Sequence, residues 1–357
     1  MLNGGSETAS ASSSATLRIG ELQAGDFRRW DEFVADCGEA TFFHRAGWKT
    51  VIEQAFGHRT SFLYAEADGR IEGVLPLAEV RSFLFGHTLV SLPFCVYGGI
   101  AASSDRARQA LDDAARSRAA QMKVDHLEYR LRAPAQDDWL QKDLYVTFRK
   151  EIDPDVERNL LAIPRKQRAM VRKGIKAGLK SEVDSGVDRF FTAYSDSVHR
   201  LGTPVFSKRY FEILMQVFGS DCEVLTITRE DGGLIASVLS FYFRDEVLPY
   251  YGGGTSQARE VAGNDFMYWE VMRRACERGL RVFDYGRSKR GTGSFDFKKN
   301  WGFDPQQLHY KYLLIKGKSI PDHNPLNPKY QMFIKLWQRM PLPLANVVGP
   351  HIVKSLG

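Results

Sequence analysis

The stretch VFDYGRSKRGTGSFDFKKNWGF, residues 282–303, gathers residue types that could carry out chemistry. Arg287 and Arg290 could hold a phosphate or a carboxylate. The glycines at positions 286, 291 and 293 would let the backbone approach such a group closely. Lys298 directly follows Phe297, so we expect its ammonium group at the lip of an apolar pocket. A cation fixed there could stabilise a developing oxyanion or orient an acyl carbonyl.

The same stretch also has a plainer interpretation. The aromatic residues that would wall a pocket, among them Phe297 and Trp301, could equally be core residues, with Lys298 on the solvent face. Asp284 stands at the expected end of a strand and is a candidate for orienting a donor group or a polar group of a substrate. The residues alone leave both interpretations open.

Composition narrows the choice of function only moderately. The chain has 357 residues, of which 43% are hydrophobic and 26% charged, with a formal net charge of +6. This balance is typical of globular domains, and an anionic partner is compatible with it but not required. No C-x-x-C, H-E-x-x-H or G-x-S-x-G motif occurs, so we expect no metal site, and we expect the four scattered cysteines to be small buried hydrophobes in a reducing compartment.

Neither the beginning of the chain nor any later segment suggests a membrane span. The opening MLNGGSETASASSSAT lacks the basic and apolar regions of a secretory signal, and its composition predicts a disordered tail over residues 1–16. No apolar run approaches the roughly 20 residues that cross a bilayer. We therefore expect a cytoplasmic protein, held at most at the inner face of the membrane.

A weak internal repeat organises the chain. One copy begins near Gly47 and the other near Arg209, and each reads as a helix, Phe-Gly, a strand, an acidic Gly turn and a second strand. Each copy continues through a Tyr-Gly segment, at Tyr97 and at Tyr251, into a helix and a further strand. The repeat predicts a duplicated α/β protein with mixed sheets.

A basic connector lies between the two copies. Residues 164–180 contain seven basic residues and no acidic one. As a helix they would place basic side chains on one face and apolar ones on another; the basic face comprises Arg165, Arg168, Arg172, Lys176 and Lys180, and the apolar face Val171, Ile175 and Leu179. The basic face is either simply solvated or a surface that faces a polyanion such as RNA.

The C-terminal residues 318–357 predict a separate arm. Phe333, Ile334 and Trp337 fall at helical spacing, and the prolines that follow them exclude a long helix. The arm could pack back onto the rest of the chain, or it could present an amphipathic patch to a membrane surface or a partner.

A coenzyme A site receives little support from the glycine-rich loop. GRSKRGTGS is at best a degenerate form of the pyrophosphate-binding pattern [Q/R]-x-x-G-x-G, with Ser288 where Gln or Arg belongs. We also expect no clean helix after this loop, although a helix N-terminus is what would bind the diphosphate.

The segment from Tyr250 to Phe303 resembles the FemAB family of peptidoglycan-precursor aminoacyl transferases. The shared features are a Tyr-Gly motif, a helix, a strand that ends in Asp, and a G…FK…GF pattern, and PRKQRAMVRKGIKAGL is similar to the family's basic segment. The resemblance covers about residues 40–314. It implies an α/β (α+β) fold of two tandem GNAT-like domains with mixed sheets, which we place at residues 17–150 and 151–317, the latter being the catalytic half.

The resemblance also implies roles for individual residues. The family's FK lysine, which is implicated in acyl transfer, falls on Lys298, and Phe297 matches as well. Tyr251 and Gly252 match the Tyr-Gly strand end as substrate-binding positions. Contacts to a nucleotide-sugar diphosphate would fall on two further residues of the second copy, Lys208 or Arg209.

The implied activity is acyl or aminoacyl transfer to a cell-envelope glycan or exopolysaccharide precursor, in a protein similar to those linked to PEP-CTERM/exosortase systems. We expect no tightly bound cofactor; the acyl donor would be a co-substrate, namely acyl-CoA, acyl carrier protein or aminoacyl-tRNA. The chain lacks the coiled-coil insertion that some family members use near tRNA. The alternatives are a non-catalytic GNAT-like module that binds a polyanion or an assembly partner, and a CoA-dependent small-molecule N-acetyltransferase.

Overall fold

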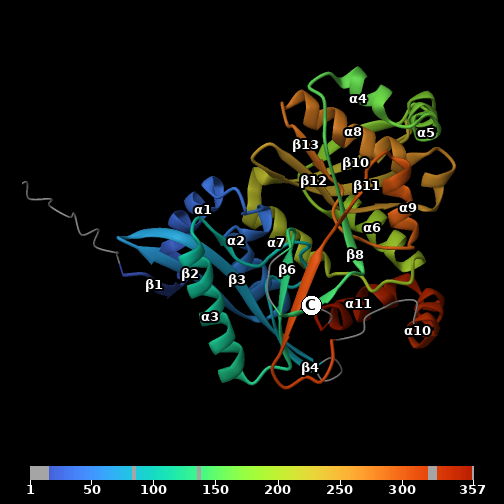
Figure 1. The fold of residues 1–357 in the computed structure, drawn as a ribbon. Coiled ribbons are helices and arrows are strands. Elements are labelled where there is room, and N and C mark those ends of the chain that lie inside the picture. Colours follow the sequence, from blue (N-terminus) through green and yellow to red (C-terminus); the bar gives the residue numbers. More distant parts are fainter. Residues whose placement is uncertain (1–15, 83–85, 135–137, 321–327, 356–357) are drawn as a thin grey trace, which may run out of the picture.

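The chain forms two mixed sheets with helices packed against them (Figure 1). The structure is a computed structural model that describes residues 16–82, 86–134, 138–320 and 328–355. Apart from its last residue, the predicted disordered tail, residues 1–16, lies outside the described residues.

The first sheet has the strand order β1-β2-β3-β4-β6-β16-β7, and the short strand β5 pairs with β3. Its strands are β1 (Arg18–Glu21), β2 (Arg59–Ala67), β3 (Arg70–Ser82), β4 (Gly86–Val90), β5 (Ala101–Ala102), β6 (His126–Leu131), β7 (Leu140–Lys142) and β16 (His309–Leu314). The pair β4–β6 is parallel and the other pairs are antiparallel.

The second sheet has the order β14-β8-β13-β12-β11-β10-β9, and β15 also pairs with β8. Its strands are β8 (Tyr145–Glu151), β9 (Lys180–Asp184), β10 (Cys222–Thr228), β11 (Leu234–Phe243), β12 (Glu246–Gly254), β13 (Val282–Asp284), β14 (Ser288–Lys289) and β15 (Pro305–Gln307). Here β12–β13 is the parallel pair. The parallel pair therefore occupies the same place in both sheets.

The helices complete the described chain. They are α1 (Phe27–Asp36), α2 (Gly47–Phe56), α3 (Asp105–Met122), α4 (Val156–Ala162), α5 (Arg165–Lys176), α6 (Asp188–Arg200), α7 (Lys208–Phe218), α8 (Gly263–Glu277), α9 (Gly293–Asn300), α10 (Pro328–Arg339) and α11 (Leu342–Val353), with short 3-10 turns η1 (Ala24–Asp26), η2 (Phe42–His44), η3 (Gly219–Asp221) and η4 (Ser256–Arg259). Among the described residues we find no helix with the length and hydropathy that a bilayer crossing requires.

The internal repeat is confirmed by the order of these elements. The first copy runs α2, β2, β3, β4, α3, β6, and the second runs α7, β10, β11, β12, α8, β13. The turn between β2 and β3 has positive φ angles of 49° at Asp68 and 74° at Gly69, which suits the twist of a two-residue hairpin. Gly279, with φ 77°, follows α8 as expected, whereas Asn264 lies inside α8 rather than at its N-cap.

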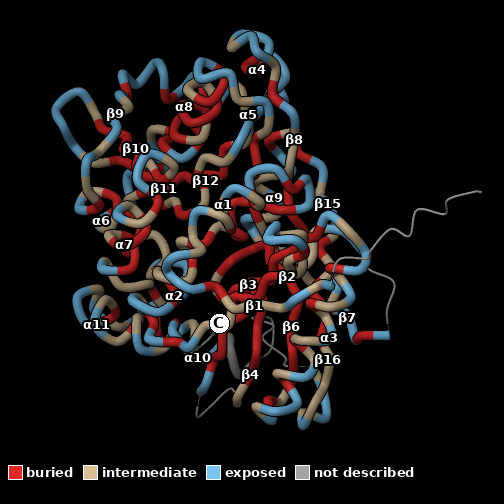
Figure 2. The backbone as a smooth tube through the Cα atoms, turned by 90° about the vertical axis from the view of Figure 1, so that its left-hand side faces the viewer, coloured by how far each residue is buried: buried red, intermediate tan, exposed pale blue. Residues whose placement is uncertain are grey.

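The two sheets exchange strands between the halves of the chain. β8 belongs to the second sheet, where it pairs with β13, and β16 returns from the end of the second half to pair with β6 (Figure 2). The division that we predicted between residues 150 and 151 falls within β8, so the sheets do not separate at that point. Each sheet therefore needs a strand from the other half of the chain.

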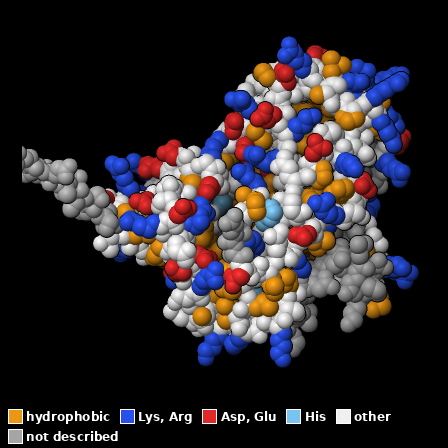
Figure 3. Space-filling view, in the orientation of Figure 1, with side chains coloured by type: hydrophobic (Ala, Val, Ile, Leu, Met, Phe, Trp, Pro, Cys, Tyr) orange, Lys and Arg blue, Asp and Glu red, His pale blue; other side chains and the backbone are white. Residues whose placement is uncertain are grey.

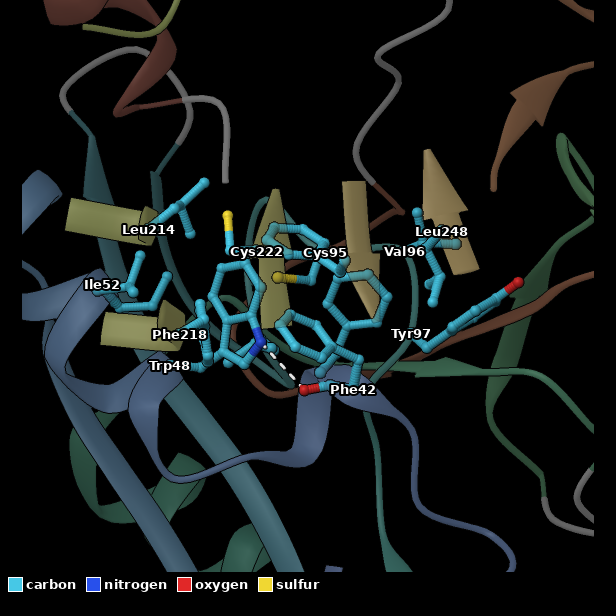
Figure 4. Close-up of a cluster of buried hydrophobic side chains, with 14 of the residues drawn as sticks. Phe42, Trp48, Ile52, Cys95, Val96, Tyr97, Leu214, Phe218, Cys222 and Leu248 are labelled. Carbon is cyan, nitrogen blue, oxygen red and sulfur yellow. Dashed lines mark hydrogen bonds between the residues drawn. The ribbon is translucent and has the colours of Figure 1, made fainter. Parts of the chain in front are cut away.

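An aromatic core joins the two halves. The ring of Phe42 stacks on Phe241 at 4.4 Å between centroids. Figure 4 shows Trp48 beside Phe218, whose ring centroids lie 5.2 Å apart. Gly47 lets α2 approach α7, since a Cβ atom at this position would lie 2.7 Å from a methyl group of Val217. Burial of these large rings makes the interface between the copies a hydrophobic core rather than a hydrated seam.

The C-terminal arm packs back onto the second half, through contacts of α10 and α11 with α6. Trp337 is only 2% exposed, and Ile334 packs directly over Gly202. All four cysteines are free and buried, as the sequence predicted.

Candidate functional site

Lys298 directs its ammonium group into the protein. It lies in the last turn of α9, where the carboxyl end of the helix favours a cation. Its Nζ atom donates to the backbone oxygens of Gly286 and Arg287, both at 3.0 Å, and lies 5.8 Å from the centroid of the Phe148 ring. Burial lowers the pKa of Lys298 to about 7.

Asp284 ends β13 and lies beside this lysine. Its side chain is fully buried and accepts hydrogen bonds from the Tyr97 hydroxyl at 2.8 Å, the Gly286 amide at 2.7 Å and the Thr147 hydroxyl at 3.3 Å. Arg149 forms an ion pair with it at 3.3 Å. The charge of Asp284 partly offsets the lowering of the Lys298 pKa by burial. Because these protein donors surround it, the Asp284 carboxylate holds the end of β13 in place and does not face the solvent.

Arg287 is a half-buried cation for which no internal counter-charge is found among the described residues. Its guanidinium lies 4.5 Å from the ring centroid of Tyr145 and donates to the Tyr310 hydroxyl at 3.1 Å. Within the described parts of the chain no carboxylate lies within ion-pair distance of it, whereas the nearby Arg130 pairs with Glu128 at 2.8 Å. Such an arginine is suited to receive a phosphate or carboxylate from outside.

The loop after β4 brings the first half of the chain to this group. Leu92 and Phe94 have positive φ angles of 62° and 69°, a backbone conformation that non-glycine residues adopt only under constraint. The Tyr310 hydroxyl donates to the Val96 oxygen at 2.6 Å, and the Tyr250 hydroxyl donates to the Phe94 oxygen at 3.2 Å. Two tyrosines of the second half therefore hold this loop of the first half in place.

The position of this loop beside Asp284 was missed by the sequence interpretation. We matched the Tyr-Gly segment at Tyr97 to the one at Tyr251, but Tyr97 lies in the loop and bonds to Asp284, while Tyr251 lies in β12. Thr147 was also missed, because nothing in its local sequence indicates that β8 pairs with β13.

The predicted substrate-binding residues of β12 lie in the core. Tyr251 is 8% exposed, and its hydroxyl lies 2.9 Å from that of Tyr210. At Gly252 an added Cβ atom would lie 3.2 Å from the Tyr268 hydroxyl. Both positions therefore pack against other residues of the second half, and no contact between Tyr251 and Lys298 is found among the described residues.

Of the aromatic residues around Lys298, one is a core residue and another could still form the wall of a pocket. Trp301 is 1% exposed and its indole N–H donates to Asp265 at 3.0 Å, which makes it a core residue. Phe297 is only half-buried and packs on Tyr268 at 5.6 Å between centroids. Of the two predicted walls, Phe297 is therefore the one that still offers a surface.

Three other predicted basic residues lie on the surface. Lys208 pairs with Asp188, and Arg209 pairs with Glu212 at 3.4 Å, both at the start of α7. Arg290 is exposed and donates to the Gln307 side chain at 2.8 Å. Within the described residues, none of them bonds to Lys298, Asp284 or Arg287.

The basic connector forms α5, which ends at Lys176 rather than continuing to Lys180. Of the predicted basic face, Arg165, Arg172 and Lys176 are exposed, and Arg168 is half-buried and donates to the Leu161 oxygen at 2.7 Å. Figure 3 shows basic side chains gathered at the corner of the molecule that carries α5. Ile175 was expected to face the core but is 49% exposed, because the close contact of Gly174 with Phe266 turns that position outward.

The glycine-rich loop leads directly into α9, contrary to our expectation that no clean helix follows it. Two surface cavities of the described residues lie elsewhere. One, of about 400 Å³, is lined in part by Arg59 and Arg118, and the other, of about 210 Å³, by Phe56 and His351. Neither of these two cavities includes Lys298.

Two mixed sheets of this strand order, each with its covering helices, define the class: the GNAT acyltransferase fold, present twice in tandem. Residues 165–299 match the family model described as an acetyltransferase (GNAT) domain. The predicted fold class is thus confirmed.

Solved structures of the same fold are distant in sequence. The crystal structure of FemX has a TM-score of 0.65 at 15% identity and covers 89% of this chain and 100% of FemX. The C-terminal domain of a putative lysylphosphatidylglycerol synthetase from Agrobacterium fabrum has a TM-score of 0.56 at 12% identity, over 81% and 92% of the two chains. A tandem GNAT protein from the clavulanic acid biosynthesis pathway gives 0.54 at 15% identity, over 85% and 100%. No curated protein sequence matches the chain.

Proposed function

We propose that this protein transfers an acyl or aminoacyl group to an amine or hydroxyl group of a cell-envelope glycan or exopolysaccharide precursor. The tandem GNAT fold and the structural likeness to FemX support acyl transfer. The resemblance of the sequence to FemAB proteins linked to PEP-CTERM/exosortase systems supports the acceptor class. The reaction would take place at the cytoplasmic side of the membrane.

The observation that carries the proposal is the enclosed ammonium group of Lys298. Its tetrahedral nitrogen is bonded to Cε and directs two N–H groups to the carbonyls of Gly286 and Arg287. One of the four tetrahedral directions of this nitrogen remains without a partner in these contacts. In the charged form this direction is an N–H that can donate to the oxyanion of a tetrahedral intermediate, and in the neutral form it is a lone pair that can accept a proton.

The reaction would follow a direct path without a covalent enzyme intermediate. The acceptor nitrogen or oxygen attacks the donor's carbonyl carbon, and the new C–N or C–O bond forms as the oxyanion develops. The bond from this carbon to the donor's carrier then breaks, and the carrier leaves with the electron pair. The acceptor loses a proton, which the neutral form of Lys298 can take, and a pKa of about 7 makes both forms available near neutral pH.

Arg287 would hold the anionic part of one substrate. Because no carboxylate neutralises it among the described residues, a phosphate or carboxylate can pair with it without displacing an internal partner. A nucleotide-sugar acceptor carries such phosphates, and so does each of the phosphate-bearing donors, acyl-CoA, acyl carrier protein and aminoacyl-tRNA. Arg290 could contribute from the exposed part of the same loop.

The proposal is tested in two steps. First, the full chain is screened by thermal shift against acyl-CoAs, aminoacyl-tRNA analogues and nucleotide-sugars, since a ligand at 100 times its Kd adds about 2.7 kcal/mol of apparent stability. Second, transfer between the stabilising ligands is followed by mass spectrometry. We expect Lys298→Ala to lower kcat by about 10²–10³-fold, while Lys299→Ala, at the exposed neighbouring position, keeps normal turnover. Normal turnover of Lys298→Ala would refute the role of this lysine.

A second candidate function is supported by α5. Its exposed basic residues could bind a polyanion such as RNA in a non-catalytic module. Binding of this kind weakens steeply with salt, with a log–log slope of about −0.7 per phosphate contact on a single strand. Loss of RNA binding in Arg172→Gln, combined with the absence of any transfer activity, would favour this candidate.

The third candidate, CoA-dependent N-acetylation of a small molecule, gains one supporting feature. α9 begins directly after the glycine-rich loop, so the loop does lead to a helix N-terminus. Stabilisation by acetyl-CoA together with acetylation of small amines, but not of glycan precursors, would favour it.

A further inference from the structure

The outward face of α10 is apolar and uncovered. Met332 and Leu336 stand one helical turn apart and are 73% and 67% exposed. The opposite face of α10 is already used, since Trp337 is buried and Ile334 packs over Gly202. The Gln338 side chain also donates to the Arg200 oxygen at 2.8 Å, which fixes α10 against the end of α6. The exposure of Met332 and Leu336 therefore follows from the docking of the helix and not from a loose arm.

Positive charge accompanies these apolar side chains. At helical spacing Lys335 and Arg339 flank Met332 and Leu336 on one side, and both are exposed. Residues 323–357 contain no aspartate or glutamate at all. The surface thus combines aliphatic side chains with cations and offers no carboxylate of its own.

The next helix repeats the pattern. On α11, Leu344 and Val347 are 50% and 65% exposed, and Lys354 is exposed just after its end. The inward residues Ala345 and Val353 are buried against the rest of the protein. Two consecutive helices therefore expose aliphatic residues while their other faces are held in the fold, and exposed cations stand on α10 and just after the end of α11.

We propose that this arm surface docks on an anionic lipid bilayer. The arm surface is defined by Met332, Lys335, Leu336, Arg339, Leu344, Val347 and Lys354. Aliphatic side chains can enter the boundary between headgroups and acyl chains while the cations meet anionic headgroups. RNA would satisfy the cations but leave the aliphatic residues in water, so a bilayer is the occupant that uses both features. The proposal is independent of the proposed acyl transfer.

Binding of the full chain to vesicles tests the proposal. Sedimentation is measured with vesicles of equal parts phosphatidylglycerol and phosphatidylcholine and with vesicles of phosphatidylcholine alone. We expect binding to the anionic vesicles and its loss in 1 M salt, where screening acts over about 3 Å. Leu336→Ser should weaken partitioning at least tenfold, and Lys335→Gln and Arg339→Gln should weaken it about fivefold each.

Matched variants at the far end of the molecule serve as controls. Leu161 on α4 is 59% exposed, and α4 lies far from α10 in both views (Figures 1 and 2). Leu161→Ser should leave binding unchanged, and so should Arg172→Gln on α5, which removes the same charge as Arg339→Gln. All the substituted side chains are solvent-exposed, so the variants should keep the thermal stability of the parent protein.

A site-specific probe separates insertion from simple adsorption. Because the four native cysteines are buried, a single Met332→Cys substitution can be labelled with an environment-sensitive dye. A blue shift of the dye on anionic vesicles, absent for the same dye at Leu161→Cys, would support the proposal. Equal binding to uncharged vesicles, no binding, loss of binding only in Arg172→Gln, or a self-association that Leu336→Ser abolishes would each overturn it.

Discussion

Replacement of Lys298 by methionine should change how the stability of the protein depends on pH. In the folded state burial lowers the pKa of Lys298 to about 7, whereas an unfolded lysine has a pKa of about 10.4. Between these two values the unfolded chain binds a proton that the folded chain does not. The free energy of unfolding of the parent protein should therefore rise with pH across this window.

The expected magnitude follows from the difference between the two pKa values. One pKa unit corresponds to about 1.4 kcal/mol, so the contribution of Lys298 should change by about 3 kcal/mol between roughly pH 7.5 and 9.5. Lys298→Met removes this contribution. It also leaves the oxygens of Gly286 and Arg287 without a donor, a loss of about 1–3 kcal/mol that does not vary with pH.

The assay compares urea unfolding of the parent protein and of Lys298→Met at several pH values. The difference in unfolding free energy, variant minus parent, should be largest near pH 7 and fall by about 1.4 kcal/mol for each pH unit up to about 10. Lys299→Met, at an exposed position, should show a curve parallel to that of the parent. A parallel curve for Lys298→Met as well would show that Lys298 is not held in a desolvating environment, and the argument for its catalytic role would fail.

Three further predictions concern residues near Lys298 and the hydrophobic interface between the two halves of the chain. Tyr97→Phe removes the hydroxyl that donates to buried Asp284, so urea unfolding should show a loss of about 1–3 kcal/mol. Gly47→Ala places a methyl group 2.7 Å from a methyl of Val217, so it should destabilise the protein by about 1–3 kcal/mol, measured in the same way. Arg287→Gln should weaken the binding of a phosphate-bearing ligand about tenfold in titration calorimetry, because it removes a charged hydrogen-bond donor, and unchanged affinity would contradict the proposed anion contact.

Local pattern was sufficient to predict most of the individual elements. The hairpin turn at Asp68 and Gly69 and the helix that ends before Gly279 follow from residue types that favour those backbone angles. Two similar series of such elements then predicted the duplication. The end of α5 was placed too late because the sequence gives no sign that β9 begins at Lys180.

The exchange of β8 and β16 could not be predicted in this way. Alternation of side chains tells whether a segment is a strand, but the identity of its partner depends on the packing of the whole fold. The consequence for the site was that Thr147 and Phe148, which lie on β8, were not recognised as neighbours of Asp284 and Lys298. Their contribution became visible only once β8 was placed beside β13.

The exchanged strand explains why the two halves have to act together at the candidate site. Lys298 and Asp284 belong to the second copy, but the ring of Phe148 and the hydroxyl of Thr147 reach them from β8, and the hydroxyl of Tyr97 reaches Asp284 from a loop of the first copy. A buried carboxylate needs such donors, and a lysine with a lowered pKa needs the desolvation that they help to enforce. The first copy therefore shapes the electrostatics of the second copy's site, even though the residues proposed to act on substrate all lie in the second copy.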